Sequence, residues 1–368
     1  MSTDLLYQIA LSLLPQIGDV HARILVEHFG EAESIFRAKK SLLEKIEGIG
    51  TFRARSVKSF QYFPRAEEEI AFIEKYKIQP LFITDQQYPR RLLNCYDAPV
   101  LLYHKGNTDL NHTRIIALIG TRTHTEYGKQ LVEKLVRDLV PFDILIVSGL
   151  AFGIDALAHR SALKHKLHTV GVLGHGLDKL YPPEHISLAK EMMHNGGLLT
   201  EFPSRTKPDK HNFPIRNRIV AGMSDASIVI ETGIKGGSMI TADLANGYNK
   251  DVFAFPGRTT DTKSSGCNEL IRTNRAMLLT DAAQLVETMG WNRQPDDAKK
   301  IKQQKEIFIT LTEIEKKIVD ILKEKSAVHI DEIHLHCDAS ASSIAAAVLN
   351  LELQGIIGSL PGKMYCLL

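Results

Sequence analysis

Little in this sequence points to an oxidising, membranous or strongly charged environment. Its 368 residues include only four cysteines, Cys95, Cys267, Cys337 and Cys366, and no C-x-x-C pair. This spacing excludes the common zinc and redox motifs and predicts reduced thiols in a cytoplasmic protein. No apolar run approaches the roughly 18 residues that a membrane span needs, so we expect no membrane insertion. The net charge is only +2, so total charge selects neither a nucleic acid nor a membrane surface as partner.

The common signatures of catalytic and cofactor sites are missing as well. The sequence has no GxxxxGK[ST] loop, which a P-loop nucleotide site requires, and no GxSxG nucleophile turn. The segment GVLGHG lacks the third glycine of the dinucleotide fingerprint. The 15 histidines do not show the HExxH spacing of zinc proteases. The sequence therefore predicts no metal, no cofactor and no catalytic residue.

What the sequence does contain is a series of strand-length apolar runs separated by helical stretches, beginning at Arg114. The runs lack polar alternation, which is typical of strands buried on both faces of a parallel sheet. Between the first two, Leu131, Val132, Leu135 and Val136 recur at helical spacing. The seven runs are RIIALIG, DILIVSG, HTVGVLG, GLLTE, ASIVIET, DVFAFPG and AMLLTD. They predict an α/β fold with an extended Rossmann-like, doubly wound parallel sheet over residues 66–290.

The N-terminal region, residues 1–65, is predicted to be a small all-α domain of the helix-hairpin-helix or SAM-like type. One turn in it carries Gly48 and Gly50, and Arg53 follows. Two readings stay open for this turn. Its glycines let backbone N–H groups approach a DNA phosphate, or they form a tight turn between two packed helices.

The C-terminal region is predicted to be separate. Residues 291–308 are polar and charged, which is typical of a linker. Residues 309–368 then read as three helices and a hairpin, a winged-helix-like domain, with Ser340 or Ser342 capping the third helix. That helix contains no Lys or Arg, and the domain has five Lys against eight acidic residues. We therefore expect this domain to bind protein rather than DNA, since an acidic module repels a phosphate backbone.

Candidate binding residues follow the apolar runs, because ligands of doubly wound sheets bind at the carboxyl ends of strands. Gly120 and Arg122 follow the first run, and Gly149 follows the second. The fifth run leads to Gly236–Ser238 at a predicted helix start, where backbone N–H groups face an anion. These positions predict a phosphate site at one edge of the sheet.

A basic and aromatic cluster extends this site. Lys210 and Phe213 combine a cation with an aromatic face, as single-strand binders do. Core packing is the alternative for Phe213, and structural ion pairing is the alternative for Arg216 and Arg218. The last two flank Asn217, and we expect this triplet to brace the loop before the glycine turn. The predicted nucleic-acid-binding residues are Gly120, Arg122, Gly149, Lys210, Phe213, Arg216, Asn217, Arg218, Gly236, Gly237 and Ser238.

Several longer segments resemble, in order, those of the DNA-processing protein A family (DprA, also called Smf). They are IGTR, SGLAFGIDALAH, GHGLDKLYPPEH, TEFP, FPIRNRIVAGMSDASIVIE, GGSMITADLA, FPG and SSGCNELI. The resemblance implies a dimer, formed through the Rossmann domain, that binds single-stranded DNA in natural transformation. It also implies that the protein protects incoming strands, helps load the recombinase RecA and is not an enzyme.

The resemblance carries the family's DNA pocket over to Arg122, to Lys210 with Phe213, and to Gly236–Ser238. This chain departs from the family's pattern at Phe152, where a basic residue is common, and at Arg275. Arg275, together with Gly48, Gly50 and Arg53, is a candidate additional DNA contact.

Two other functions stay open from the sequence. GGSMITADLA distantly resembles the PGGxGTxxE loop of Rossmann enzymes that cleave nucleotides, with Asp243 in place of the glutamate. A nucleotide-responsive binding protein is the third reading.

Overall fold

The computed structural model describes residues 3–292, 311–324, 328–337, 339–360 and 364–367. It divides into two compact units, Met1–Met289 and Gly290–Leu368. Most of the linker predicted over residues 291–308 lies outside the described residues. Within the described part of the chain, no helix is both long and apolar enough to cross a membrane.

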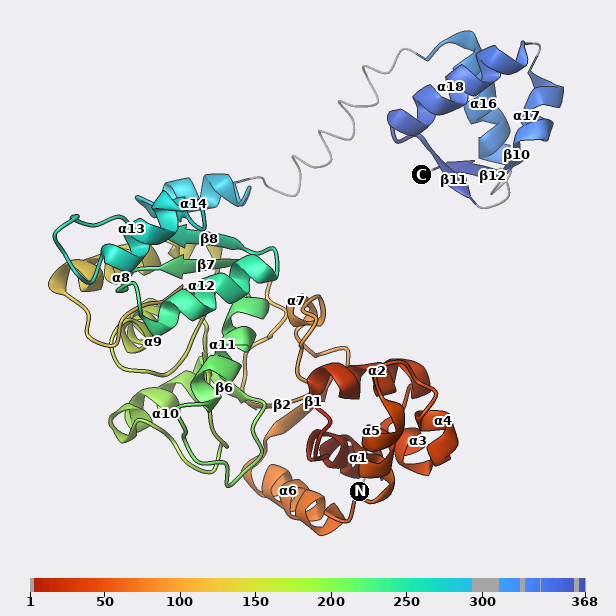
Figure 1. The fold of residues 1–368 in the computed structure, drawn as a ribbon. Helices are drawn as coiled ribbons and strands as arrows, with labels where there is room; N and C mark the ends of the chain where they lie inside the picture. The colour runs from red at the N-terminus through yellow and green to blue at the C-terminus, as the bar shows by residue number, and fades with distance from the viewer. Residues whose placement is uncertain (1–2, 293–310, 325–327, 338, 361–363, 368) are drawn as a thin grey trace. The chain divides into compact units, whose positions relative to one another are not determined.

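The first unit is built on one sheet of nine strands (Figure 1). Seven of them, β3 to β9, run parallel, and β1 and β2 add an antiparallel edge. The strand order is β1-β2-β6-β5-β4-β3-β7-β8-β9. The strands are β1 (Gln79–Phe82), β2 (Leu101–Gly106), β3 (Ile115–Ile119), β4 (Leu145–Ser148), β5 (Thr169–Val172), β6 (Gly196–Thr200), β7 (Ala226–Val229), β8 (Asp251–Ala254) and β9 (Met277–Leu278). Each of the seven apolar runs supplies one parallel strand, which confirms the predicted fold class.

The order of the strands creates a switch point at β3. From β3 the chain moves through β4 and β5 to β6 on one side, then returns to β7 on the other side of β3. The connections that follow the neighbouring strands β3 and β7 run in opposite directions along the sheet, and they open a crevice at the carboxyl ends of these strands. The segments after β3, β4 and β7 therefore meet at this crevice.

Helices cover both faces of this sheet. Right-handed crossovers that run in opposite directions along a sheet place their helices on opposite faces. Helix α8 packs against α9, and α11 packs against α12. The helices are α8 (Glu126–Asp138), α9 (Ile154–Lys164), α10 (Ile186–His194), α11 (Asn212–Gly222), α12 (Gly237–Gly247), α13 (Ser265–Arg272) and α14 (Ala282–Thr288). The spacing that predicted α8 buries Val132, Leu135 and Val136 against the rest of the unit.

The N-terminal helices share a hydrophobic core with the antiparallel edge of the sheet. Ile9 and Leu25 from the helices belong to the same buried cluster as Leu81 and Leu102 from β1 and β2. The helices are α1 (Thr3–Ser12), α2 (Asp19–Phe29), α3 (Ala32–Arg37), α4 (Lys40–Leu43), α5 (Gly50–Lys58), α6 (Phe63–Tyr76) and α7 (Arg90–Leu93). The boundary expected after residue 65 falls inside α6, and the division of this unit into two domains stays a prediction.

The second unit has the winged-helix arrangement that the sequence predicted. Its elements are α16 (Glu313–Glu324), β10 (Val328–His329), α17 (Ile330–His336), α18 (Ala341–Leu353), β11 (Ile357–Leu360) and β12 (Met364–Leu367). The strands pair in the order β10-β12-β11. Ser340 is the cap of α18, because its hydroxyl accepts a hydrogen bond from the N–H of Ser343 at 3.2 Å. Ile318, Ile333, Ile344 and Leu351 are fully buried in a core that belongs to this unit.

Candidate nucleic-acid interface

A cavity of about 360 Å³ opens at the switch point of the sheet. It lies between the segments that follow β3, β4 and β7 and the outer face of α11. Ten of the eleven residues predicted for nucleic-acid binding line it. They are Gly120, Arg122, Gly149, Lys210, Phe213, Arg216, Asn217, Gly236, Gly237 and Ser238. Positions spread over 119 residues of sequence are thus gathered at one place, as the switch-point rule requires.

Arg122 presents a cation beside an aromatic ring at the mouth of this cavity. Its guanidinium carbon is 5.6 Å from the centroid of the Phe213 ring, within the range of a cation–π contact. Among the described residues, no carboxylate lies within 4 Å of this exposed guanidinium, so its donors are available to a ligand. The arrangement suits a phosphate on the cation and a base on the ring.

The loop that carries Arg122 is held in place by a buried carboxylate, that of Glu231. One carboxylate oxygen of Glu231 accepts from the backbone N–H of Thr125 at 2.9 Å, and the other accepts from the Thr125 hydroxyl. The carbonyl of Glu231 accepts from the N–H of Thr121 at 2.7 Å. On the outer side, Lys263 donates to Thr123, with 3.1 Å between Nζ and Oγ1. The loop is therefore fixed on both sides of Arg122 before any ligand arrives.

A second arginine, Arg216, forms part of the cavity wall. It is buried, donates to the carbonyl of Val172, and its Nε lies 3.1 Å from Oδ1 of Asn217. Burial lowers the pKa of Arg216, and the nearby Asp155 opposes this shift. Burial likewise raises the pKa of Asp155, opposed chiefly by Arg216. Arg216 thus adds a largely buried positive charge to the wall of the site.

Gly149 makes room for this buried cation. A Cβ at Gly149 would stand 2.6 and 2.7 Å from the two terminal nitrogens of Arg216, and it would also collide with Asp155. The sequence placed Gly149 among the binding residues, and the structure gives this glycine a packing role as well, since Arg216 and Asp155 leave no room for a side chain. Gly120 is similar, because its Cβ would lie 2.5 Å from the Ile154 side chain.

The turn Gly236–Ser238 forms the start of α12, as predicted. Gly236 is the N-cap with extended backbone, and no side chain caps the helix. The hydroxyl of Ser238 donates to Oγ1 of Thr232 at 2.7 Å, which ties the first turn of the helix to the segment after β7. The first N–H groups of an α-helix have no partner within the helix and carry the positive end of its dipole. This end lines the cavity and suits an anion.

Arg218 does not join this group. It lies on the opposite side of α11, where it pairs with Glu201 and, at 2.8 Å, with Asp19 of α2. The sequence led us to expect that Arg216, Asn217 and Arg218 together brace the loop before the glycine turn, and this shared role stays a prediction. Residues 212–222 form α11, so residues 213, 216 and 217 share one face through the helical repeat and residue 218 faces away.

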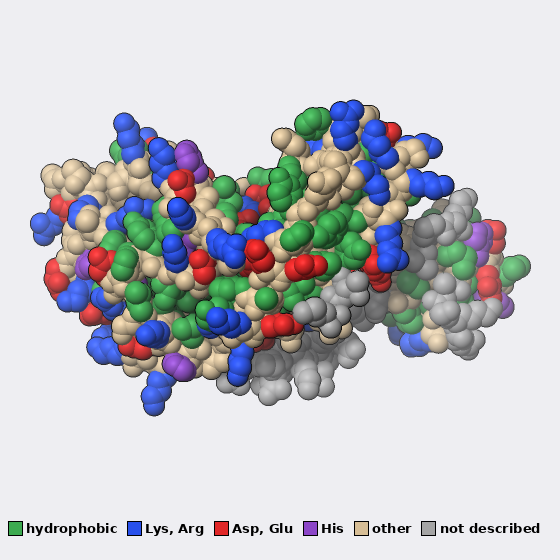
Figure 2. Space-filling view, turned by 90° about the horizontal axis from the view of Figure 1, so that it is seen from below, with side chains coloured by type: hydrophobic (Ala, Val, Ile, Leu, Met, Phe, Trp, Pro, Cys, Tyr) green, Lys and Arg blue, Asp and Glu red, His purple; other side chains and the backbone are tan. Residues whose placement is uncertain are grey.

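The additional candidates also lie away from the cavity. Arg275 pairs with Asp243 at 2.9 Å, beside β9. Gly48 and Gly50 have positive φ angles of 82° and 59° and form the turn before α5, where Arg53 donates to the Gly48 carbonyl at 3.0 Å. This geometry favours the tight-turn reading for the two glycines. Figure 2 shows basic and acidic side chains interspersed over the face that it presents, in keeping with the small net charge.

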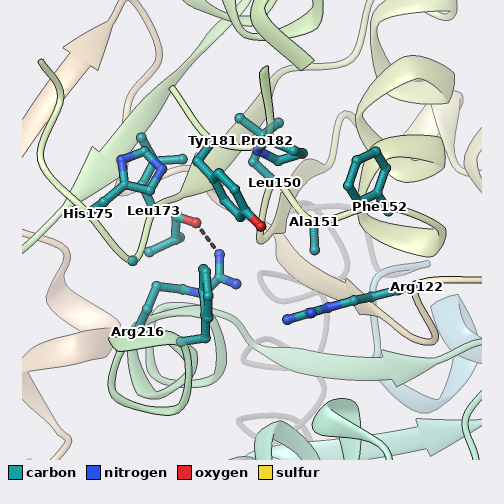
Figure 3. A pocket seen from close by; sticks show the side chains of 12 residues that line it. Arg122, Leu150, Ala151, Phe152, Leu173, His175, Tyr181, Pro182 and Arg216 are labelled. Atoms are coloured by element: carbon teal, nitrogen blue, oxygen red, sulfur yellow. Dashed lines mark hydrogen bonds between the residues drawn. The ribbon is translucent and has the colours of Figure 1, made fainter. Parts of the chain in front are cut away.

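A second, smaller pocket adjoins the cavity and was not predicted from the sequence (Figure 3). It has a volume of about 40 Å³ and shares Arg122, Ala151, Phe213 and Arg216 with the cavity. Its other walls are Leu150, Phe152, Val172, Leu173, Gly174, His175, Tyr181 and Pro182. The segments GLAFG and GHGLDKLYPP supply most of these residues. Both segments were noted in the sequence, but a pocket formed by them was not predicted. Phe152 packs edge-on against His185 with 5.0 Å between ring centroids.

The geometry offers little support for catalysis. Asp243, the acid expected for nucleotide cleavage, is exposed, pairs with Arg275 and does not line the cavity. Asp155 is the carboxylate that does line it, and this residue is buried beside Arg216. Over the described residues, no group of three His, Cys, Asp or Glu side chains is arranged to hold a metal ion.

Comparison with known proteins matches both units to one family. The family model for DNA recombination-mediator protein A matches residues 79–290, and the DprA winged helix domain matches residues 309–363. Protein Smf from Synechocystis sp. is 30% identical over 399 residues, which cover 98% of each chain. DNA processing protein DprA from Bacillus subtilis is 40% identical over 213 residues, or 58% of this chain and 72% of the relative.

Solved structures agree with this assignment. DNA processing protein A from Streptococcus pneumoniae superposes with a TM-score of 0.65 at 34% identity, covering 77% of this chain and 97% of that one. The protein from Helicobacter pylori, whose structure concerns its single-stranded DNA binding mode, gives a TM-score of 0.54 at 32% identity and covers 59% and 98%. The resemblance noted in the sequence is confirmed, and the chain belongs to the DNA recombination-mediator protein A (DprA/Smf) family.

Proposed function

We propose that this protein binds single-stranded DNA without a sequence requirement and acts in the processing of DNA during natural transformation. The observation that carries the proposal is the contact between Arg122 and Phe213 at the mouth of the switch-point cavity. The Helicobacter pylori relative, which has a described single-stranded DNA binding mode, supports the same ligand. In this role the protein shields incoming strands and helps load RecA in the cytoplasm.

The chemistry of the cavity matches the two parts of a single strand. Arg122, Lys210 and the N-terminus of α12 supply donors for consecutive phosphates. The ring of Phe213 supplies a stacking surface, which every base satisfies. Buried Arg216 strengthens the positive potential of the cavity. Because these contacts address the backbone and the base face, they favour binding that tolerates any sequence.

We propose binding rather than catalysis. The nucleotide-cleaving alternative needs a carboxylate at the sugar, and the pairing of Asp243 with Arg275 argues against that residue. Incubating the protein with a nucleoside monophosphate and assaying free base tests this directly. Release of base at a rate above that of a heat-inactivated sample would favour the enzyme, and saturable binding without release would favour the nucleotide-responsive reading.

We also propose a homodimer formed through the Rossmann-like sheet. β9 is the edge strand of that sheet, and Met277 and Leu278 on it are each 42% exposed. An exposed apolar edge strand is a template for pairing with another chain. Light scattering of wild type and Leu278→Lys checks this, and the variant is expected to shift towards the monomer.

The main test measures fluorescence anisotropy of a labelled oligonucleotide, single-stranded or in duplex, across a salt series. We expect preference for the single strand and a steep fall in affinity between about 50 and 200 mM salt. Arg122→Glu should weaken binding roughly 10- to 100-fold, since it removes a charge-assisted contact and adds repulsion. Arg137→Glu, at the far end of α8, is the matched control and should bind like wild type. Equal binding of duplex and single strand, or equal effects of the two variants, would contradict the proposal.

A further inference from the structure

The small pocket beside Arg122 and Phe213 has the walls of a site for a nucleobase. Leu150, Phe152, Leu173 and Pro182 make it apolar, and Tyr181 closes it. The rings of Tyr181 and Phe213 have their centroids 6.3 Å apart and their planes 32° from parallel. Figure 3 shows the Tyr181 ring between His175 on one side and Phe152 and Arg122 on the other. Two roughly parallel rings at an opening next to a phosphate site are suited to taking up one base.

His175 lines this pocket and carries one buried nitrogen without a hydrogen-bond partner among the described residues. Its side chain is 1% exposed, and its Nδ1 lies 2.9 Å from the carbonyl oxygen of Gly176. A carbonyl oxygen only accepts, so Nδ1 carries the proton and Nε2 of the neutral ring is an acceptor. Nε2 is buried and has no hydrogen-bond partner within the described part of the chain. Buried polar atoms are generally paired in folded proteins, so this nitrogen indicates a ligand.

We infer that this pocket receives one base of the bound strand and that Nε2 of His175 accepts a hydrogen bond from the exocyclic amino group of that base. The inference rests on the proposed function and adds a preference to it. Cytosine and adenine carry an exocyclic amino donor at the relevant position, whereas thymine and guanine carry a carbonyl acceptor there. The carbonyl would face the lone pair of Nε2, and only the ring N–H beside it can donate, so thymine and guanine make the weaker contact. The pocket is small, about 40 Å³, so any base must displace one of its walls, and cytosine displaces it less than the larger adenine.

Tyr181 is the side chain that must move for a base to enter. A base between two rings needs about 3.5 Å on each side, or roughly 7 Å in all, which exceeds the present 6.3 Å between centroids. Tyr181 is 46% exposed and can rotate outward, whereas Phe213 is partly buried in α11. Tyr181 therefore acts as the movable wall and Phe213 as the fixed one.

The test compares the full chain with its His175→Leu and His175→Gln variants. Competition anisotropy uses oligodeoxycytidine and oligodeoxythymidine of about 12 nucleotides, which is within the site size of single-strand binders. His175→Leu should weaken binding of oligodeoxycytidine about 3- to 10-fold, the effect of one lost hydrogen bond, and weaken binding of oligodeoxythymidine by a smaller factor. His175→Gln should recover part of the loss, because its side-chain oxygen accepts. Comparing the two oligomers within each variant removes differences in their intrinsic flexibility.

Tyr181 supplies a test that does not depend on a buried residue. Tyr181→Ala should weaken both homopolymers about 5- to 10-fold through lost stacking, while Tyr181→Phe should not. An oligomer with abasic sites throughout should bind all the Tyr181 variants equally. If His175→Leu does not fold, the comparison of Tyr181→Ala with Tyr181→Phe still tests whether a base enters the pocket.

Three results distinguish a failure of the base pocket from a failure of the proposed binding of single-stranded DNA. Equal losses of the two homopolymers in His175→Leu, or no loss of either, would overturn the base pocket and leave it a structural cavity or a water site. If Tyr181→Ala weakens binding of the abasic oligomer as much as binding of the homopolymers, the base pocket is likewise overturned. Wild-type protein that binds no single strand at all would instead refute the proposed function.

Discussion

Arg218 and Glu201 form a buried ion pair that ties three parts of the first unit together. The two side chains are only 9% and 10% exposed. Arg218 also lies 2.8 Å from the carboxylate of Asp19 in α2 and donates to the carbonyl of Asp97. One guanidinium thus links α11, the segment after β6 and the N-terminal helices. The two arginines of the triplet Arg216-Asn217-Arg218 serve different purposes, because Arg216 lines the ligand cavity and Arg218 braces the fold.

The first prediction separates these two purposes by stability. At pH 8, above the pKa of Glu201, Arg218→Met should lower the free energy of unfolding by about 3 kcal/mol, since it leaves the ionised Glu201 buried without its cation. Arg122→Met should change it by less than about 0.5 kcal/mol, because Arg122 is exposed, and should instead weaken DNA binding. Urea unfolding of the two variants checks this. Equal stability of Arg218→Met and wild type would refute the bracing role.

A second prediction concerns pH. Burial raises the pKa of Glu201 to about 7, with the Asp19 and Asp97 carboxylates adding to the effect and Arg218 opposing it. The folded state therefore holds a proton on Glu201 that the unfolded state, with a pKa near 4.5, releases. The contribution of Glu201 to stability is full below pH 4.5 and is lost as the pH rises through about 7.

Measuring this contribution requires a difference between two proteins. Burial lowers the pKa of His104 and His159 to about 4, and these histidines produce the opposite slope over part of the same pH range. Subtracting the pH profile of Glu201→Gln from that of wild type removes them. The wild type should lose on the order of 2–3 kcal/mol relative to the variant between pH 4.5 and pH 8. If the free energies of unfolding of wild type and Glu201→Gln change in parallel from pH 4.5 to pH 8, Glu201 is ionised over this whole range and its pKa is not raised.

The sequence predicted the fold and most of the cavity because both depend on local patterns. Each buried strand appears as an apolar run, and the switch-point rule then places Gly120, Gly149 and Gly236 together without further information. The pairing of Arg218 with Asp19 could not be predicted, since 199 residues separate the partners. The roles of His175 and Tyr181 were equally hidden, because a pocket wall depends on how loops fold over one another.

The third prediction uses two glycines of the cavity as a matched pair. Gly149→Ala should destabilise the protein by about 1–3 kcal/mol and weaken DNA binding, because its methyl group displaces the guanidinium of Arg216. Gly237→Ala should be neutral or slightly stabilising, since nothing lies within 4 Å of the added carbon and alanine favours a helix start. Thermal melting compares the stability of the two variants, and anisotropy measures DNA binding by Gly149→Ala. A Gly149→Ala variant that behaves like Gly237→Ala would show that Arg216 can relocate without cost.

The fourth prediction is that the winged-helix unit contributes no affinity for DNA. Winged helices usually read DNA with the third helix, and α18 contains no Lys or Arg. Its exposed face is formed by uncharged side chains, including Ala345, Ala346, Leu349 and Leu353. Such a surface suits a protein partner, because it offers nothing to a phosphate and buries apolar area on contact.

Removing the winged-helix unit tests whether it contributes to DNA affinity. The shortened chain is expected to fold, because the first unit has its own extensive core. A chain ending at Met289 should bind single strands within about two-fold of the full chain, with the same slope of log affinity against log salt, because that slope counts the phosphates neutralised. The separate unit from Gly290 to Leu368 should not shift a labelled strand even at low salt. A shallower slope for the shortened chain would mean that cations of the second unit reach the strand, and the assignment of this domain to protein contacts would then be wrong.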